Sequence, residues 1–397
     1  MSAERLPPAP ATSRRGAAAW AFPLVTFLVV VIGGAILQRD LITWPGPQWD
    51  SRIYLHAFAI MAAGGDPYEE PGFVYTPPCA VAGTAIYRAL GPWGLLVALR
   101  AASLVGLWLL VWASLARIRW SLSARAIAAL MVVLSPLVGN GLGAANLSMV
   151  LNGPLMAALL FAERWPLASG FVAATANVLK PVGASAMAVL VTPQRGRRLA
   201  AWGPQFVIGA AAAGLWLLVG SRYLPSMLGR VGGFPDRVRN VSLARVFYVF
   251  GLDVNPLGIF AAVTALGMVF AWLRVISHRQ RLAVAGTTTL LALPVNNPHT
   301  FLLTLPAQAL ALERALTRLA AARRGRSNSR RALAEVALVV GAIVDVHGSE
   351  GATTTGELPL LVQGMVTLMP LVAITALTVY GVECDQLDPE VSAEAAP

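Results

Sequence analysis

Charged residues are scarce in this sequence. Asp, Glu, Lys and Arg together make up 12% of the 397 residues, and hydrophobic residues make up 57%. A soluble domain carries about 25% charged residues, so this composition excludes an ordinary soluble protein. Apolar blocks long enough to cross a bilayer recur along most of the chain, without the alternation typical of membrane-barrel strands. The sequence therefore predicts an all-α polytopic membrane protein.

Cysteine and lysine are almost absent. Cys79 and Cys384 lie far apart in the sequence, so they provide neither a disulfide framework nor a metal-binding motif. Lys180 is the only lysine of the chain, and arginine supplies the other 29 of the 30 basic residues. A chain that otherwise uses arginine therefore places its one lysine inside an apolar stretch.

The net charge of +11 comes from arginines that separate the apolar runs. Their main clusters lie at residues 117–125, 194–198, 274–281 and 323–331. Basic residues sharing one surface would indicate nucleic-acid binding, whereas this spread is the positive-inside pattern of a membrane protein, with some attraction to anionic lipids. We therefore expect membrane lipids as partners and no nucleic acid.

Placing the arginine clusters on the cytoplasmic side divides the chain into three parts. Residues 1–16 are expected to form a disordered cytoplasmic tail, residues 17–380 an integral membrane domain, and residues 381–397 an acidic cytoplasmic tail. The first apolar run, about 17–38, is too long for a signal-peptide core and lacks a small-residue cleavage site, so we interpret it as an uncleaved span.

The membrane domain is predicted to contain about twelve helices. The expected spans lie near residues 17–38, 94–116, 126–139, 147–162, 166–179, 181–192, 199–220, 254–273, 282–295, 300–320, 332–346 and 359–380. Several are shorter than the ~20 residues of a straight span, so we expect half-helices that neighbouring helices bury. Residues 79–90 are an alternative additional short span.

Two regions on the predicted outer side are more than simple turns. Residues 39–78 hold five of the nineteen acidic residues, and within them residues 51–63 have the spacing of an amphipathic helix lying in the membrane interface. The acids of DPYEEP at 66–70 are expected in an exposed turn. Residues 221–252 hold five arginines. A cationic outer loop breaks the positive-inside rule, and a bound anion explains it better than topology does.

Lys180 interrupts the apolar stretch 170–191. A lysine at the centre of a membrane helix costs roughly 2.5–3.5 kcal/mol on insertion scales, and such residues usually face a cavity or a partner. Pro181 breaks the helix directly after Lys180. A new helix N-terminus beside an ammonium group suits an anion such as phosphate. The alternative is that the side chain extends to the membrane interface.

Four further polar features fall on the same predicted side. Asp50 is either a general base for a sugar hydroxyl or a solvated or capping carboxylate. His299 either binds a phosphate or sugar hydroxyl or contacts a neighbouring helix. Arg237 and Arg239 form either a specific phosphate site or lipid-headgroup contacts. Asn146 lies between the third and fourth expected spans.

The order of these motifs resembles glycosyltransferase family 87. After Asp50 come GGDPYEEPGFVYTPP, Gly-x-x-Asn ending at Asn146, Lys180 with its proline, Asn-x-Ser-Leu beginning at Asn240, and His299. The resemblance runs from about residue 17 to residue 320. The family pattern usually has Gln where this chain has Ala144, and an aromatic residue with a histidine where this chain has NNPHTF.

The resemblance implies a GT-C-fold membrane enzyme that uses a polyprenyl-phosphate sugar, with mannose favoured. Asp50 would deprotonate the acceptor, and the hydroxyl would attack the anomeric carbon with inversion. Lys180, Arg237, Arg239 and His299 would bind the donor phosphate. The implied substrate-binding residues are Arg52, Tyr54, Tyr75, Asn146, Asn240 and Ser242.

No cofactor or metal is expected, because a cationic pocket can stabilise a monophosphate leaving group and no carboxylates cluster in the sequence. The implied acceptor is a lipid or a glycan, and the implied location is the cell membrane with the active site on the extracytoplasmic side. Two other functions stay open: a secondary transporter of an anionic or lipid-linked substrate, and a non-catalytic lipid-binding protein.

Overall fold

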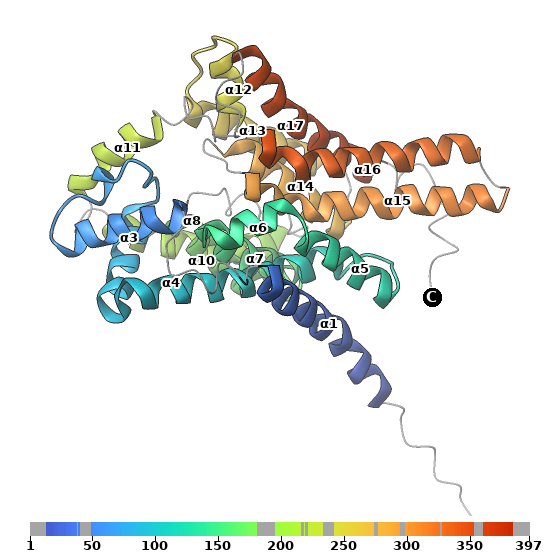
Figure 1. Cartoon of the computed structure of the whole chain (residues 1–397), viewed down its shortest axis with the longest axis horizontal. Helices are drawn as coiled ribbons and strands as arrows, with labels where there is room; N and C mark the ends of the chain where they lie inside the picture. Colours follow the sequence, from blue (N-terminus) through green and yellow to red (C-terminus); the bar gives the residue numbers. More distant parts are fainter. Residues whose placement is uncertain are drawn as a thin grey trace, which may run out of the picture.

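A computed structural model of the chain describes eleven stretches of it. They are residues 13–37, 39, 49–180, 195–215, 218, 221–232, 242–273, 277–293, 298–325, 328–352 and 360–383. All regular elements within these stretches are helices (Figure 1). The predicted all-α class is therefore seen in the part of the chain that the structure describes.

The helices follow one another along the whole membrane domain. Their bounds are α1 (Ser13–Leu37), α3 (Trp49–Ala62), η1 (Pro67–Glu69), α4 (Pro77–Leu115), α5 (Leu122–Val133), α6 (Pro136–Gly143), α7 (Leu147–Leu160), α8 (Pro166–Leu179), α10 (Arg195–Leu215), η3 (Ser221–Tyr223), α11 (Leu224–Gly232), α12 (Leu243–Val249), α13 (Pro256–Leu273), α14 (His278–Ala292), η5 (Pro298–Thr304), α15 (Leu305–Arg323), α16 (Ser329–Ala352) and α17 (Leu360–Glu383).

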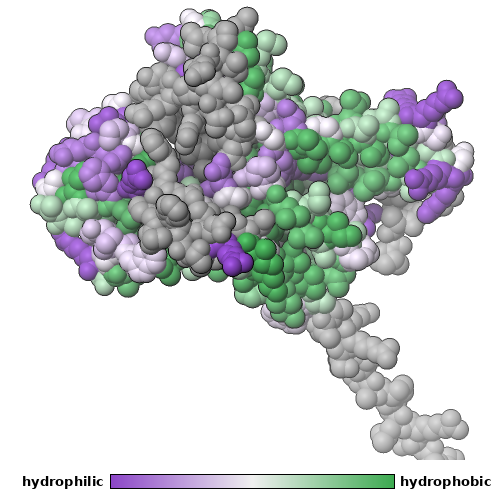
Figure 2. All heavy atoms as spheres, in the orientation of Figure 1, coloured by the Kyte–Doolittle hydropathy of each residue, from purple (hydrophilic) through white to green (hydrophobic). Residues whose placement is uncertain are grey.

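Long apolar helices identify a membrane protein. By length and composition, α4 and residues Val362–Val382 of α17 can each cross a bilayer, and α5 with α6 make a third span if they count as one helix bent by 59°. Figure 2 shows hydrophobic side chains over α5, α15 and α16, where Ile127, Met131 and Leu338 are exposed. Hydrophilic side chains gather near α3 and at the α15–α16 turn. The total of about twelve spans stays a prediction.

Most predicted spans coincide with helices, and two boundaries differ. Residues 79–90 belong to the first part of α4, which the non-helical backbone of Gly91 (φ 70°, ψ 175°) and Pro92 separate by a kink from the rest of that helix, so a separate short span at 79–90 stays a prediction. The span expected at 126–139 is split by the bend between α5 and α6. The span expected at 181–192 lies outside the described residues, as do residues 1–12 and 384–397 of the expected tails.

Two glycines let α4 and α7 cross in backbone contact. A Cβ atom added to Gly106 would lie 2.0 Å from the carbonyl oxygen of Met149, and one added to Gly153 would lie 1.9 Å from the carbonyl oxygen of Gly106. Small residues at a membrane-helix crossing allow this approach. Buried Leu107 and Leu155 belong to the hydrophobic core around the crossing. The crossing sets the position of α7, whose first residues belong to the site described below.

Helix α3 confirms the helix predicted at 51–63. Its buried face includes Tyr54 and Phe58, which form one cluster with Phe73 and Tyr75 from the segment before α4. His56 lies on the exposed face. The apolar face of α3 therefore packs against protein, and its placement in the membrane interface stays a prediction.

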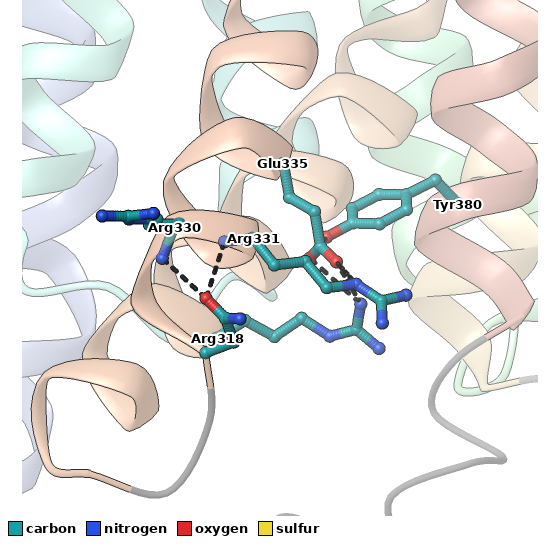
Figure 3. A network of polar contacts seen from close by, with 6 residues as sticks. Arg318, Arg330, Arg331, Glu335 and Tyr380 are labelled. Carbon is teal, nitrogen blue, oxygen red and sulfur yellow. Dashed lines mark hydrogen bonds and ion pairs between the residues drawn. The ribbon is translucent and has the colours of Figure 1, made fainter.

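A polar network joins α15, α16 and α17 near the α15–α16 turn (Figure 3). Glu335 accepts hydrogen bonds from Arg318 at 3.1 and 3.0 Å and from the Tyr380 hydroxyl at 3.1 Å. Arg331, one turn before Glu335, lies 3.6 Å from the same carboxylate. The network therefore ties three helices together at the end of the molecule where hydrophilic side chains surround the turn.

Candidate active site

The site forms where the starts of α3 and α7 meet. Asp50 lies in the first turn of α3, and Asn146 is the N-cap residue of α7. The side-chain nitrogen of Asn146 donates a hydrogen bond to Oδ2 of Asp50 at 2.6 Å, across 96 residues of sequence. Two residues that the sequence proposed as separate site members are therefore in direct contact.

Asn146 is held in place by the way α6 ends. Ala144 is the C-cap residue of α6. The next residue, Ala145, adopts a left-handed conformation with φ 50°, which is uncommon for a residue with a side chain. The amide of Ala145 bonds to the carbonyl of Leu142, and the amide of Asn146 bonds to the carbonyl of Gly141. This is a Schellman motif without its usual glycine.

Tyr54 and Tyr75 form a second contact between the same elements. Their hydroxyl groups lie 2.6 Å apart, and the Tyr54 oxygen also accepts a hydrogen bond from the backbone N–H of Leu147 at 3.2 Å. Burial, followed by the neighbouring phenol and the Asp50 carboxylate, raises the pKa of Tyr54. Burial and the Asp50 charge likewise raise the pKa of Tyr75. Both phenols therefore stay protonated and act as neutral hydrogen-bonding groups.

Lys180 enters the same site from the end of α8. Helix α8 ends at Leu179, and Lys180 is extended, which confirms the predicted break at this point. The ammonium group donates a hydrogen bond to the Ser148 hydroxyl and lies 5.2 Å from the centre of the Tyr75 ring. Burial lowers the pKa of this ammonium group to about 8, while the Asp50 charge acts in the opposite direction. The sequence offered no acidic partner for Lys180 in the apolar core, and the fold places Asp50 of α3 near enough for its charge to act on the ammonium group.

Thr76 fixes the position of Lys180. The Thr76 hydroxyl donates to the carbonyl oxygens of Val178 and Leu179, at 2.5 and 3.1 Å. It also caps the N-terminus of α4 by accepting from the backbone N–H of Cys79. The end of α8 is thereby joined to the start of α4, directly beside Tyr75.

The acidic DPYEEP segment is more than the exposed turn that the sequence predicted. Asp66 accepts from the backbone N–H of Tyr68 at 2.9 Å and from the Ser226 hydroxyl of α11 at 2.8 Å. Arg230 of α11 donates to the carbonyl oxygen of Tyr68 at 3.0 Å. Glu70 is paired with His56 at 2.5 Å. The expectation was wrong for these two acids, because α11 and α3 fold back onto the segment.

The Tyr68 hydroxyl, in turn, donates to the carbonyl oxygen of Tyr75 at 2.6 Å. A continuous series of contacts therefore runs from α11 through η1 to the phenol pair. The docking of α11 supports the backbone on which Tyr75 is presented to the site.

The structure does not bring every predicted site residue to this place. Arg52 lies on the exposed face of α3. Ser242 is buried as the N-cap of α12, where its hydroxyl accepts from the backbone N–H of Arg245 at 3.2 Å. The backbone of His299 belongs to η5, and its side chain is outside the described part. Also outside it are Arg237, Arg239 and Asn240.

Sequence reasoning missed Ser148 and Thr76. Both are small hydroxyl residues at helix starts, the positions where such side chains commonly bond to backbone groups. Thr76 stands directly before two prolines, and Ser148 is the second residue after the Asn146 cap. The capping signal was therefore present, but their contacts with α8 and Lys180 join residues at least 32 positions apart.

A carboxylate, an ammonium group and two neutral phenols at the polar end of an apolar helical bundle can accept a proton and bind an anion. The family model described as Glycosyltransferase family 87 matches residues 73–304, more than half of the chain. The chain belongs to glycosyltransferase family 87, and it is a membrane glycosyltransferase. The family resemblance seen in the motifs is thereby confirmed.

The matched region contains Tyr75, Asn146 and Lys180, whereas Asp50 and Tyr54 precede it. A comparison with curated proteins gives no match. Among solved structures, the chain is similar to the crystal structure of ArnT from Cupriavidus metallidurans in the apo state, with 15% identity and a TM-score of 0.44. That similarity covers 96% of this chain and 80% of the ArnT chain.

Proposed function

We propose that this glycosyltransferase moves mannose from a polyprenyl-phosphate donor to a hydroxyl group of a lipid or glycan, at the extracytoplasmic face and with inversion. The observation that supports the proposal best is the start of α7. Asn146 contacts the Asp50 carboxylate, and Ser148, two residues later, contacts the Lys180 ammonium group. A single helix start therefore holds a candidate base and a candidate phosphate ligand side by side.

In the proposed reaction, Asp50 takes the proton of the acceptor hydroxyl as the oxygen attacks the anomeric carbon. A new glycosidic C–O bond forms, and the bond between the anomeric carbon and the phosphate oxygen breaks. The electron pair of that bond leaves with polyprenyl phosphate, where Lys180 neutralises the developing charge. The products are the glycoside and polyprenyl phosphate, with the proton on Asp50.

The remaining sequence-derived residues keep proposed roles that differ in their support. Tyr54 and Tyr75 are neutral and suit contacts with sugar hydroxyl groups. Arg237, Arg239 and His299 are proposed as further phosphate ligands, and Arg52 and Asn240 as substrate contacts. Ser242 has the least support as a substrate contact, because its hydroxyl caps α12. The GT-C fold, about twelve spans and an extracytoplasmic site belong to the same proposal.

Family membership favours a transferase over the secondary transporter that the composition also allowed. The two functions differ in a simple outcome. A transferase links the labelled sugar covalently to an acceptor, whereas a transporter moves the labelled molecule unchanged across the membrane.

The test is transfer of radiolabelled mannose from polyprenyl-phosphate-mannose in membranes that contain the chain. Replacing Asp50→Ala should lower transfer by about 10²–10⁴-fold, the usual contribution of a positioned base. Asp253→Ala is the matched control, because Asp253 is an exposed aspartate beyond α12. Equal transfer by wild type and Asp50→Ala would remove Asp50 from the mechanism. Transfer from a different polyprenyl-phosphate sugar alone would replace mannose in the proposal.

A further inference from the structure

We propose that Asn146 is a positioning residue for Asp50 and not a contact of the sugar. This inference rests on the proposed function, in which Asp50 is the base. It reassigns a residue that the family resemblance placed among the substrate-binding residues.

Both ends of the Asn146 amide are engaged inside the protein. Its Oδ1 accepts from the backbone N–H of Ser148 at 2.7 Å, so the opposite end of the group, which carries the N–H donors, faces Asp50. The residue is 1% exposed. Rotating the amide toward a substrate would remove the cap of α7 and the hydrogen bond to Asp50 together.

The backbone before Asn146 adds a second constraint. Ala145 holds a left-handed conformation, and such strain persists only where the surrounding structure compensates for it. The amide of Asn146 is bonded to the carbonyl of Gly141, so the end of α6 and the start of α7 both fix this residue. The geometry therefore defines the direction from which the amide reaches Asp50.

The chemical effect follows from what an amide can do. An N–H donor favours the ionised carboxylate, which is the form that accepts a proton, and an amide does not itself titrate in the working pH range. Within the described part of the chain, the Asp50 charge also acts on Tyr54 from α3, Tyr75 from the segment before α4, and Lys180 from the end of α8. Asn146, from α7, adds an uncharged N–H donor to these side chains.

Two substitutions separate positioning from capping. Asn146→Ser keeps an oxygen that can cap α7 but removes the amide donor. Asn146→Asp keeps both the shape and the cap, and places a second carboxylate against Asp50. Asn328→Asp is the matched control, since Oδ1 of Asn328 accepts from the backbone N–H groups of Arg330 and Arg331 at 3.0 and 3.3 Å. It makes the same chemical change at another helix start.

We expect both Asn146 variants to lower kcat about 10–100-fold while the KM for the donor changes by no more than about twofold. In Asn146→Asp the acidic limb of the pH–rate profile should move to higher pH by about one unit or more, because two adjacent carboxylates resist joint ionisation. Asn328→Asp should leave both quantities unchanged. A raised KM without a pH shift would make Asn146 a substrate contact, and unchanged kinetics would also overturn the proposal.

An infrared titration of the purified protein gives a readout that needs no activity. The pH-dependent carboxyl band that disappears in Asp50→Asn belongs to Asp50, and its midpoint should rise in both Asn146 variants. If wild type transfers no mannose but the midpoint rises, the proposed function fails and the contact between the two residues stands. An unchanged midpoint overturns the positioning role, whatever the transfer assay shows.

Discussion

Lys180, the only lysine of the chain, donates a hydrogen bond from its ammonium group to the hydroxyl of Ser148 in the first turn of α7. Asn146, at the cap of the same helix, holds Asp50. The two contacts come from side chains two residues apart, so any movement of the α7 start would shift the proposed base and the proposed phosphate ligand together. The following predictions test this arrangement and the packing that supports it.

Replacing Lys180→Ala should weaken binding of polyprenyl phosphate to the purified protein by about tenfold or more, because a charge-assisted contact to a phosphate contributes about 1.5–3 kcal/mol. Ser148→Ala should have a smaller effect, since the ammonium group keeps its place over the Tyr75 ring. Titration of the purified protein with polyprenyl phosphate measures both. Arg88→Ala controls for general loss of positive charge, as Arg88 bonds to the carbonyl of Ala62. Wild-type affinity in Lys180→Ala would exclude its phosphate role.

The two phenols should differ in their effect on stability. Tyr54→Phe leaves the backbone N–H of Leu147 without its acceptor, which costs about 1–3 kcal/mol when the group is buried. Tyr75→Phe leaves that hydrogen bond intact and should destabilise the protein less. Thermal unfolding in detergent measures the order, and a larger loss in Tyr75→Phe would contradict the contact pattern.

The same pair should not cause the alkaline limb of the pH–rate profile. The pKa of each phenol is raised, so both groups stay protonated at pH values where an ordinary tyrosine begins to ionise. Tyr75→Phe should therefore lower the rate without moving the alkaline limb. Disappearance of the limb in this variant would show that the Tyr75 phenol does titrate in the working range.

Ala145→Gly should stabilise the protein. A residue with a Cβ atom pays about 1–2 kcal/mol in the left-handed region, and glycine removes this cost while adding a smaller entropic one of about 0.4–1 kcal/mol. Ala144→Gly is the matched control, because Ala144 has an ordinary right-handed helical conformation and glycine should destabilise it. The melting temperature should rise in Ala145→Gly and fall in Ala144→Gly, relative to wild type. A loss of stability in both variants would contradict the left-handed geometry.

Gly153→Ala should destabilise the crossing of α4 and α7. Its new methyl group would meet the Gly106 carbonyl oxygen, and relieving this overlap should cost about 1–3 kcal/mol. Gly341→Ala in α16 is the control, because a Cβ atom there meets nothing within 4 Å. The control should be neutral or stabilising. Equal melting temperatures for the two variants would show that the helices can separate at this point without cost.

Local features of the sequence predicted local features of the structure. The spacing of residues 51–63 predicted α3, and the Lys180-Pro181 pair predicted that α8 ends at this point. These predictions succeed because backbone hydrogen bonding and proline sterics act over a few residues. The same reasoning predicted an exposed turn for Asp66. Its partner Ser226 lies 160 residues later, and no residue near Asp66 in the sequence indicates that contact.

The sequence by itself determined the membrane class, the helices and the family, because hydrophobic length, helix-ending residues and motif order are properties of short stretches of chain. Only the tertiary structure decided three contacts. Asn146 donates a hydrogen bond to Asp50, Ser148 accepts one from Lys180, and Thr76 donates to the carbonyl groups at the end of α8. These contacts depend on how closely α7 approaches α4 and α3. That approach is set by side-chain volume at Gly106 and Gly153 and by burial of the aromatic cluster, which act between segments far apart in sequence but adjacent in space.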